Sequence, residues 1–405
     1  MRFMNLMILF PLVASLVACH KDRPDEIEPA KPIVLTEQQS YILTDANTFA
    51  FDLYKEMELD NPGKSRMISP LSASLALSLL STGARSQTAD EIISALGFDC
   101  SAEEMSAFYR HLMTQLLKVD PSTTLESANS VWANKFIELQ KSFVRSSEKY
   151  FDAEVRSVDF TDPKTTAAIN SWCSDKTHGR IKSIVDSMDP QTLVAILNAL
   201  YFNGKWSKEF KTSHKDVFRC SDGSSKEVEM MTRKLNCKYN EDASFRMVEI
   251  PYGNGAFAMD IVLPVKDDPE KFNEEVRKMS ALEWYSLTAM LGHESVSVEL
   301  PAFKMECEYD FIPYLKKLGI SKAFTTDADF SGISETPSYV SQIIQKTYID
   351  VNKKGTEAAA VTMIANKMTS AGPDMDILFR VDRPFIFAIR EVSTGAILFI
   401  GQKAD

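Results

Sequence analysis

Apolar side chains recur at helical spacing soon after residue 36. The recurring positions are Ala46, Phe49, Ala50, Leu53, Tyr54 and Met57. Residues three and four apart lie on one face of a helix, so this pattern predicts an amphipathic helix. Thr36 with Gln39 is typical of a capping box and predicts where that helix begins.

Capping residues mark further helix ends. Thr88 with Glu91 repeats the capping-box pattern, and Gly97 predicts the end of that helix. Asp162 followed by Pro163 predicts the start of another, because both residue types favour the beginning of a helix. Helices therefore dominate the first part of the chain.

Strand patterns dominate the second part. Residues 193–202 are almost uniformly apolar, which predicts a strand covered on both faces in the middle of a large sheet. Residues 245–252 and 257–263 flank a Gly-Asn-Gly turn, as in a β-hairpin. Further strand-like runs lie at 295–300, 385–389 and 396–400. The order of elements predicts one mixed α+β domain at 36–405 with large sheets.

The N-terminal residues differ from the rest of the chain. Arg2 precedes an apolar stretch too short to span a bilayer, which predicts an export signal at 1–18. Leu16-Val17-Ala18-Cys19 resembles a bacterial lipobox, in which the chain is cut before the cysteine and the cysteine is lipidated. We therefore expect Cys19 to anchor the protein to a membrane, at the bacterial cell surface or in the periplasm; plain secretion is the alternative. Residues 19–35 are rich in proline and charge, which predicts a flexible spacer.

Composition and charge exclude several classes of function. The chain is 44% hydrophobic with a net charge of −11 and no basic cluster, so nucleic acid is not the expected partner. It has none of the common hydrolase, phosphate-binding or dinucleotide-binding motifs, and its histidines are scattered, so an enzyme is not expected. The cysteines after Cys19 are spaced like neither a disulfide framework nor a zinc site, so we interpret them as small buried residues, although one bridge is compatible with their number. We expect no metal and no organic cofactor.

The segment at 352–373 is the most informative part of the chain. Consecutive alanines favour a helix locally, but Thr356 lacks a capping-box partner and Val361-Thr362 favours a strand. In a strand, one face would carry Thr356, Ala358, Ala360, Thr362 and Ile364. This face is small at its start, so it is able to enter between two existing strands without overpacking the core beneath.

Several motifs resemble those of the serpin family. Residues 352–362 resemble the serpin hinge, and residues 379–389, FRVDRPFIFAI, resemble the C-terminal signature of the family. Upstream matches in family order are Ile68-Ser69-Pro70-Leu71-Ser72, Ile169-Asn170 with Trp172 and Gly179, Asn198-Ala199-Leu200-Tyr201-Phe202, Gly204-Lys205-Trp206 and Leu300-Pro301-Ala302-Phe303. On these motifs the chain is identified as a member of the serpin family.

The resemblance implies a fold and a set of site residues. The implied fold is the α+β serpin fold, with three β-sheets, eight or nine helices and an exposed reactive-centre loop at about 353–378. The implied hinge is Gly355, Thr356, Glu357, Ala358, Ala359, Ala360, Val361 and Thr362. The polar shutter and breach that control opening of the large sheet would be Ser69, Ser72, Asn198, Trp206 and Gln345. Ordinary capping and core hydrogen bonding is the alternative for these polar residues.

The implied function is suicide inhibition of extracellular serine endopeptidases, and of some cysteine endopeptidases. The family's cleavage position lands on Thr369-Ser370, with Lys367 and Met368 as neighbouring candidates. Thr369 suits an elastase-like protease and Lys367 a trypsin-like one. The expected partner is the target protease in a covalent 1:1 complex, with the inhibitor itself a monomer. The alternative is a non-inhibitory serpin that acts as a binding or structural protein.

Three positions depart from the family pattern. Lys353 stands where the family usually has glutamate at the base of the hinge, and Ala302 stands where it usually has the lysine partner. We therefore expect the usual ion pair to be missing, which would weaken the top of the sheet. Gln345 occupies the place of a shutter histidine, so we expect no pH-linked gating through that residue.

Overall fold

The computed structural model describes residues 28–356, apart from residue 191, and residues 376–405. Its α-helices are α1 (Glu37–Asp60), α2 (Pro70–Gly83), α3 (Ser86–Ala95), α4 (Ala102–Leu116), α5 (Lys141–Phe151), α6 (Pro163–Lys176), α7 (Phe272–Val276), α8 (Ala281–Ala289) and α9 (Ile312–Lys317). Short 3-10 helices lie at η1 (Pro269–Lys271) and η2 (Lys322–Phe324). None of the helices in these ranges has the length and apolar character needed to cross a membrane.

The strands form two hydrogen-bonded sheets in the described ranges. One, which we call the hinge sheet, has the order β10 (Phe303–Asp310), β11 (Ile344–Asn352), β12 (Gly355–Thr356), β4 (Val194–Lys205), β2 (Thr124–Asn134) and β3 (Glu154–Val158). The second sheet has the order β1 (Arg66–Ile68), β15 (Ile397–Lys403), β14 (Phe385–Glu391), β8 (Phe257–Pro264), β7 (Phe245–Pro251), β6 (Ser225–Glu241), β9 (Gly292–Pro301) and β13 (Ile377–Arg380). A further strand, β5 (Thr212–Arg219), pairs with β6.

The second sheet explains why two sheets are found where the family resemblance implied three. Strand β6 is 17 residues long and pairs with β9 along much of its length. Its last residues, from Lys238 to Glu241, also pair with β7. One long strand therefore joins what would otherwise be two separate sheets.

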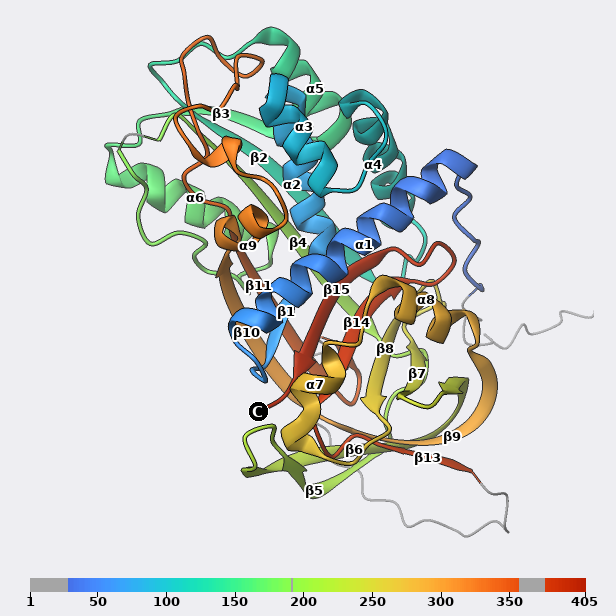
Figure 1. Ribbon diagram of the computed structural model, residues 1–405. Helices are drawn as coiled ribbons and strands as arrows, with labels where there is room; N and C mark the ends of the chain where they lie inside the picture. The colour runs from blue at the N-terminus through green and yellow to red at the C-terminus, as the bar shows by residue number, and fades with distance from the viewer. Residues whose placement is uncertain (1–27, 191, 357–375) are drawn as a thin grey trace, which may run out of the picture.

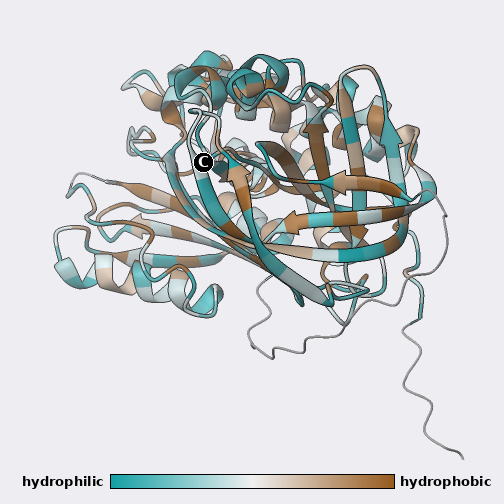
Figure 2. Cartoon of the chain, turned by 90° about the horizontal axis from the view of Figure 1, so that it is seen from below, coloured by the Kyte–Doolittle hydropathy of each residue, from teal (hydrophilic) through white to brown (hydrophobic). Residues whose placement is uncertain are grey.

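Helix α2 lies at the centre of the helical layer. It packs against β4 of the hinge sheet and β15 of the second sheet, and α1, α3, α4 and α5 surround it (Figure 1). Helix α6 packs against β2 and β4 on the opposite face of the hinge sheet. We call the face towards α2 the inner face and the face towards α6 the outer face. Apolar residues are concentrated on the central strands, and peripheral helices carry many hydrophilic residues (Figure 2).

Two of the three predicted helix starts are confirmed, and one is wrong. The capping box of Thr36 and Gln39 is confirmed at the start of α1, and Asp162 caps α6 with Pro163 in its first turn. The capping box of Thr88 and Glu91 is wrong, because α3 already begins at Ser86. These two side chains instead accept hydrogen bonds from backbone N–H groups of the distant residues 329, 321 and 322.

The predicted strands are confirmed. Residues 193–202 correspond to β4, the hairpin to β7 and β8, and the last two runs to β14 and β15. The predicted spacer is described only from Glu28 onward. There, Ile33 is 8% exposed and its N–H donates to the Ser393 hydroxyl, so the end of the spacer packs against the domain.

Candidate functional site

The first two residues of the predicted hinge form a short strand held between two long strands. Strand β12 (Gly355–Thr356) pairs antiparallel with Val351 of β11 and Gly204 of β4. Thr356 is only 2% exposed, and its hydroxyl lies 2.6 Å from the hydroxyl of Tyr252. Burial raises the pKa of the Tyr252 phenol far above its usual range, so the phenol stays neutral and this hydrogen bond persists at physiological pH.

The close approach of β12 to β4 requires glycine at the first hinge position. A Cβ atom on Gly355 would lie 2.1 Å from the carbonyl oxygen of Gly204 and 2.6 Å from the Cα of Lys205. These are backbone atoms, which cannot move aside as a flexible side chain would. Any larger residue at 355 would therefore push β12 off β4.

Trp206 fixes the turn between β11 and β12. Its indole N–H donates to the carbonyl oxygen of Asn352 at 2.9 Å, and its ring stacks on Tyr252 with centroids 4.4 Å apart. Its backbone N–H donates to the carbonyl oxygen of Lys354. The stacked pair of Trp206 and Tyr252 therefore contacts both the turn and Thr356.

The base of the hinge has an ion pair with a different partner from the one expected. Ala302 carries no charge and so cannot pair with Lys353. Instead, the Nζ of Lys353 lies 3.7 Å from Oε1 of Glu229 in β6. The backbone carbonyl of Glu229 accepts the N–H of Ala302, so the acid sits beside the expected partner position. The usual ion pair between positions 353 and 302 is therefore missing, as expected, but Lys353 is not left unpaired, because Glu229 supplies an acid from β6.

Ser69 and Gln345 are joined by two hydrogen bonds at the buried start of α2. The side-chain amide of Gln345 accepts the Ser69 N–H at 2.7 Å and donates to the Ser69 carbonyl oxygen at 2.9 Å. The Ser69 hydroxyl caps α2 by accepting the N–H of Ser72 and donates to the carbonyl oxygen of Leu398. Ser69, Ser72 and Gln345 thus lie together, and Gln345 ties β11 to α2.

Asn198 lies outside that group. Its amide donates to Oδ1 of Asn129, its cross-strand neighbour in β2, at 2.6 Å. The amide of Asn129 donates in turn to the carbonyl oxygen of Phe151. Oδ1 of Asn198 is buried and has no hydrogen-bond partner in the described chain. Sequence reasoning missed Asn129, because β2 is largely polar around it and no hydrophobic pattern marks the residue.

The hinge sheet contains a slot one strand wide. Strands β4 and β11 are each hydrogen-bonded to β12, but no pairing joins them directly in the described ranges. Neighbouring strands lie about 4.8 Å apart, so a strand between them places β4 and β11 about 10 Å apart at the level of β12. Beyond the level of Thr356, no strand of the described residues pairs with the facing edges of β4 and β11.

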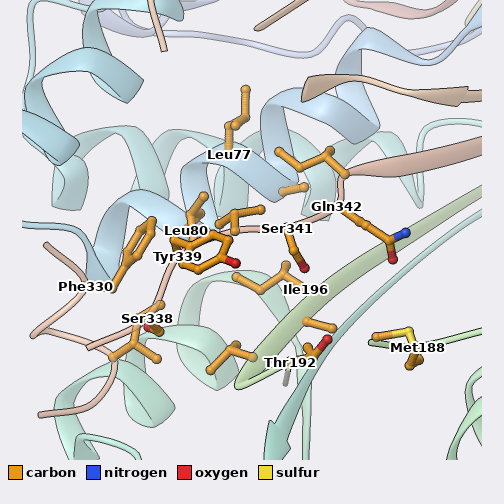
Figure 3. A pocket seen from close by; sticks show the side chains of 16 residues that line it. Leu77, Leu80, Met188, Thr192, Ile196, Phe330, Ser338, Tyr339, Ser341 and Gln342 are labelled. Carbon is orange, nitrogen blue, oxygen red and sulfur yellow. The ribbon is translucent and has the colours of Figure 1, made fainter. Parts of the chain in front are cut away.

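The end of the slot that is farther from β12 opens into a small cavity of about 50 Å³. Leu77 and Leu80 of α2, Ile196 of β4, and Tyr339 and Ser341 of the segment before β11 line it (Figure 3). The inner face of the slot is therefore covered by α2 and leaves little free space. An entering strand must have small side chains on that face.

Several predicted site residues lie outside the described residues. These are Cys19, the hinge residues Glu357, Ala358, Ala359, Ala360, Val361 and Thr362, and the bait residues Lys367, Met368, Thr369 and Ser370. Beyond the loop the chain resumes at Asp376, which accepts a hydrogen bond from Ser295 and pairs with Lys234. Thr356 thus lies in the hinge sheet, whereas Asp376 directly precedes β13 of the second sheet.

The cysteines of the described chain are free. Cys173, Cys220 and Cys237 are buried, as interpreted from the sequence, whereas Cys100 and Cys307 are half-buried. Burial raises the pKa of the Cys173 thiol to about 11, which disfavours the reactive thiolate. Across the described ranges, no group of three or more His, Cys, Asp or Glu side chains is placed to hold a metal ion.

Known proteins resemble this chain over most of its length. Residues 44–405 match the family described as Serpin (serine protease inhibitor). The leukocyte elastase inhibitor of Equus caballus is 35% identical over 379 residues, which cover 89% of this chain and 98% of the relative. Serpin B6 of Pongo abelii is 33% identical over 374 residues, with coverages of 89% and 98%.

Solved structures show the same fold. The native state of tengpin, a thermophilic serpin, has a TM-score of 0.83 and 30% identity, covering 93% of this chain and 97% of tengpin. Thyroxine-binding globulin in complex with thyroxine has a TM-score of 0.81 and 26% identity, covering 90% of this chain and 99% of the globulin.

Proposed function

This chain belongs to the serpin family, which is described as a family of serine protease inhibitors rather than enzymes, and we propose that it traps extracellular endopeptidases as covalent acyl-enzymes. The protease attacks a bond in the loop, and the freed hinge enters the slot between β4 and β11 as a new strand. Such loop insertion is the established behaviour of inhibitory serpins. The tethered protease is carried along, and its distorted active site fails to release the acyl group.

The slot with β12 at its upper end is the observation that carries this proposal. The pairing of Thr356 with Val351 and Gly204 sets the register for any residues that follow it. Continued two residues at a time, this register places Ala360 between Leu200 and Thr347. Small side chains suit these positions, because they face α2 and the apolar core.

The same register brings Thr362 between Asn198 and Gln345. Oδ1 of Asn198 is the buried acceptor without a partner, and a threonine hydroxyl beside it is able to donate the missing hydrogen bond. Satisfying a buried acceptor is worth about 1–3 kcal/mol. The inserted state therefore repairs a defect of the uninserted state, which favours insertion.

We propose Thr369-Ser370 as the cleaved bond, with Lys367 and Met368 as neighbouring alternatives. Thr369 presents a small side chain to an elastase-like pocket, and the relative named leukocyte elastase inhibitor supports a target of that type. Cleavage after Lys367 would indicate a trypsin-like target instead. The expected complex contains one protease and one inhibitor.

We also propose that the protein is exported and lipidated at Cys19. The packing of Ile33 against the domain would leave the residues before Glu28 as the tether to the membrane. Cys19→Ser should move the protein from the membrane fraction to the soluble fraction and abolish incorporation of radiolabelled palmitate. Unchanged fractionation and labelling would remove the lipoprotein proposal but not the inhibitory one.

The test of inhibition is incubation of the protein with elastase-like and trypsin-like proteases. A band of summed mass that resists denaturant is expected, and mass spectrometry of the released peptide identifies the bond. Ala360→Glu should convert inhibitor to substrate, because a carboxylate buried without a partner costs several kcal/mol. Ala371→Glu adds the same charge beyond the cleaved bond and should still form complex.

Other outcomes have defined meanings. Stable complexes of Ala360→Glu equal to those of the parent would contradict strand insertion. Loop cleavage without any complex in the parent would support the non-inhibitory alternative. Thyroxine-binding globulin in complex with thyroxine shows that this fold is able to carry a ligand.

A further inference from the structure

A segment that follows α6 crosses the outer face of the slot. We call residues 177–188 the strap. The chain leaves α6 through His178 and Gly179, which have φ values of +50° and +74° and turn it sharply off the helix. Asn170 of α6 then holds the strap: its Oδ1 accepts the N–H groups of Ile184 and Val185, and its Nδ2 donates to the carbonyl oxygen of Val185.

The strap contacts strands on both sides of the slot. Its apolar residues Ile181, Ile184 and Val185 share one buried cluster with Trp132 of β2 and with Leu197 and Ala199 of β4, against which Ile344 and Tyr348 of β11 pack. The guanidinium carbon of Arg180 also lies 5.6 Å from the ring centroid of Tyr348. The strap therefore ties β11 to β4 below the level of β12.

His178 fastens the strap to the β2 and β4 side. Its Nε2 lies 3.0 Å from Oε2 of Glu126, and its ring centroid lies 4.7 Å from that of Tyr201. Glu126 and Tyr201 are direct cross-strand neighbours, so one imidazole contacts both strands. The side chains of His178 and Glu126 are 51% and 47% exposed, which leaves the pair open to exchange protons with solvent.

An entering strand must displace the strap. The inner face of the slot is closed by α2, so the hinge has to enter from the outer face, which the strap crosses. The hinge remains attached to β11 at one end and carries the protease at the other after cleavage, so it cannot be threaded beneath a fixed strap. Residue 359, in the register set by β12, would come to lie between Tyr201 and Tyr348, directly below the contacts of His178 and Arg180.

From this geometry we infer that His178 is a positioning residue for strand insertion, which holds the strap over the slot through Glu126 and must release it before the hinge enters. The inference rests on the proposed inhibitory function. The contact of His178 would then affect the fraction of cleaved molecules that form the covalent complex.

The charge on His178 sets the strength of the contact. The titratable and charged groups on the elements around it are Glu126 of β2, Tyr201 of β4, Asp175 and Lys176 of α6, and Arg180, Lys182 and Asp186 of the strap. Of these, Lys176 pairs with Glu154. Imidazoles gain a proton between about pH 8 and 5. The cation is attracted by Glu126 and by the carbonyl end of α6. Insertion should therefore be slower at acid pH than at pH 8.

The test measures the ratio of cleaved inhibitor to covalent complex with one protease from pH 8 to pH 5.5, in the parent and in His178→Gln. Comparing both at each pH removes the pH dependence of the protease. An exposed ion pair is worth up to about 1 kcal/mol. The ratio of cleaved inhibitor to complex in the parent, divided by the same ratio in His178→Gln, should therefore rise about two- to fivefold towards pH 5.5. Glu126→Gln should behave like His178→Gln.

His214 provides a matched control. It is also 51% exposed and contacts a carboxylate, Asp216, at 3.3 Å, but it lies on β5 of the second sheet. His214→Gln should keep the pH response of the parent. A pH response that is equal in the parent and His178→Gln would overturn the inference.

Hydrogen exchange of the strap separates this inference from the proposed function. At pH 5.5, the amides of residues 181–185 should exchange at least about twofold faster in His178→Gln than in the parent, without any protease present. Equal exchange would overturn the positioning role. Faster exchange together with the absence of any covalent complex would instead refute inhibition and leave the strap contact standing as a structural one.

Discussion

Replacement of Gln345 by leucine should destabilise the protein at the junction of β11 and α2. The substitution keeps most of the side-chain volume but removes both hydrogen bonds to Ser69, at 2.7 and 2.9 Å. The Ser69 carbonyl retains the N–H of Ala73, whereas no other partner of the Ser69 N–H is seen in the described chain. An unsatisfied buried N–H costs about 1–3 kcal/mol and the lost second bond of the carbonyl about 1 kcal/mol. We therefore expect a loss of about 2–4 kcal/mol.

The assay is urea unfolding followed by tryptophan fluorescence at pH 7.5, with the first transition compared between variants. Gln342→Leu is the matched control, because Gln342 is exposed just before β11 and should change stability by less than about 0.5 kcal/mol. If the free energy of unfolding of Gln345→Leu differed from that of the parent by less than about 0.5 kcal/mol, the two hydrogen bonds would not join β11 to α2 as described.

Two further perturbations test other parts of the fold. Burial raises the pKa of Asp260 to about 6, above its ordinary value of 3.8, so the protonated form is favoured by folding and this group gains stability as the pH falls from about 7 to 4.5. In urea unfolding, the parent should therefore gain at most about 3 kcal/mol relative to Asp260→Asn over that range, and a pH-independent difference between the two would refute the shift. Gly355→Ala should cost about 1–3 kcal/mol and lower the yield of covalent complex, because its Cβ would meet the Gly204 carbonyl oxygen. Gly292→Ala, which meets no atom within 4 Å, should leave both unchanged, and equal results for the two glycines would contradict the close packing of β12.

Much of the local structure was predictable because its causes are local. The capping box of Thr36 and the proline start of α6 depend on residues within a few positions, and both are present as predicted. The apolar run that became β4 needed no partner to be recognised as a buried strand. The pattern at Thr88 failed because its hydroxyl binds the N–H of Asp329, about which a local motif carries no information.

The family was also evident in the sequence. The Gly-Thr-Glu-Ala-Ala run and the C-terminal signature indicated a serpin, and the family match and the solved structures establish that membership. The small-residue face beginning at Thr356 indicated where a strand would enter. The roles proposed for the hinge, the bait and Cys19 remain predictions for the experiments described above.

Only the tertiary structure decided which side chains meet. Glu229 pairs with Lys353, Gln345 binds the backbone of Ser69, and Asn198 pairs with Asn129 rather than with Ser69 or Ser72. The strap reaches both sides of the slot only because α6 lies over β2 and β4. Periodicity and capping are set by neighbours along the chain, and so the amino-acid sequence alone determined them. Contacts between residues hundreds of positions apart depend on strand register and sheet order, which no local pattern specifies.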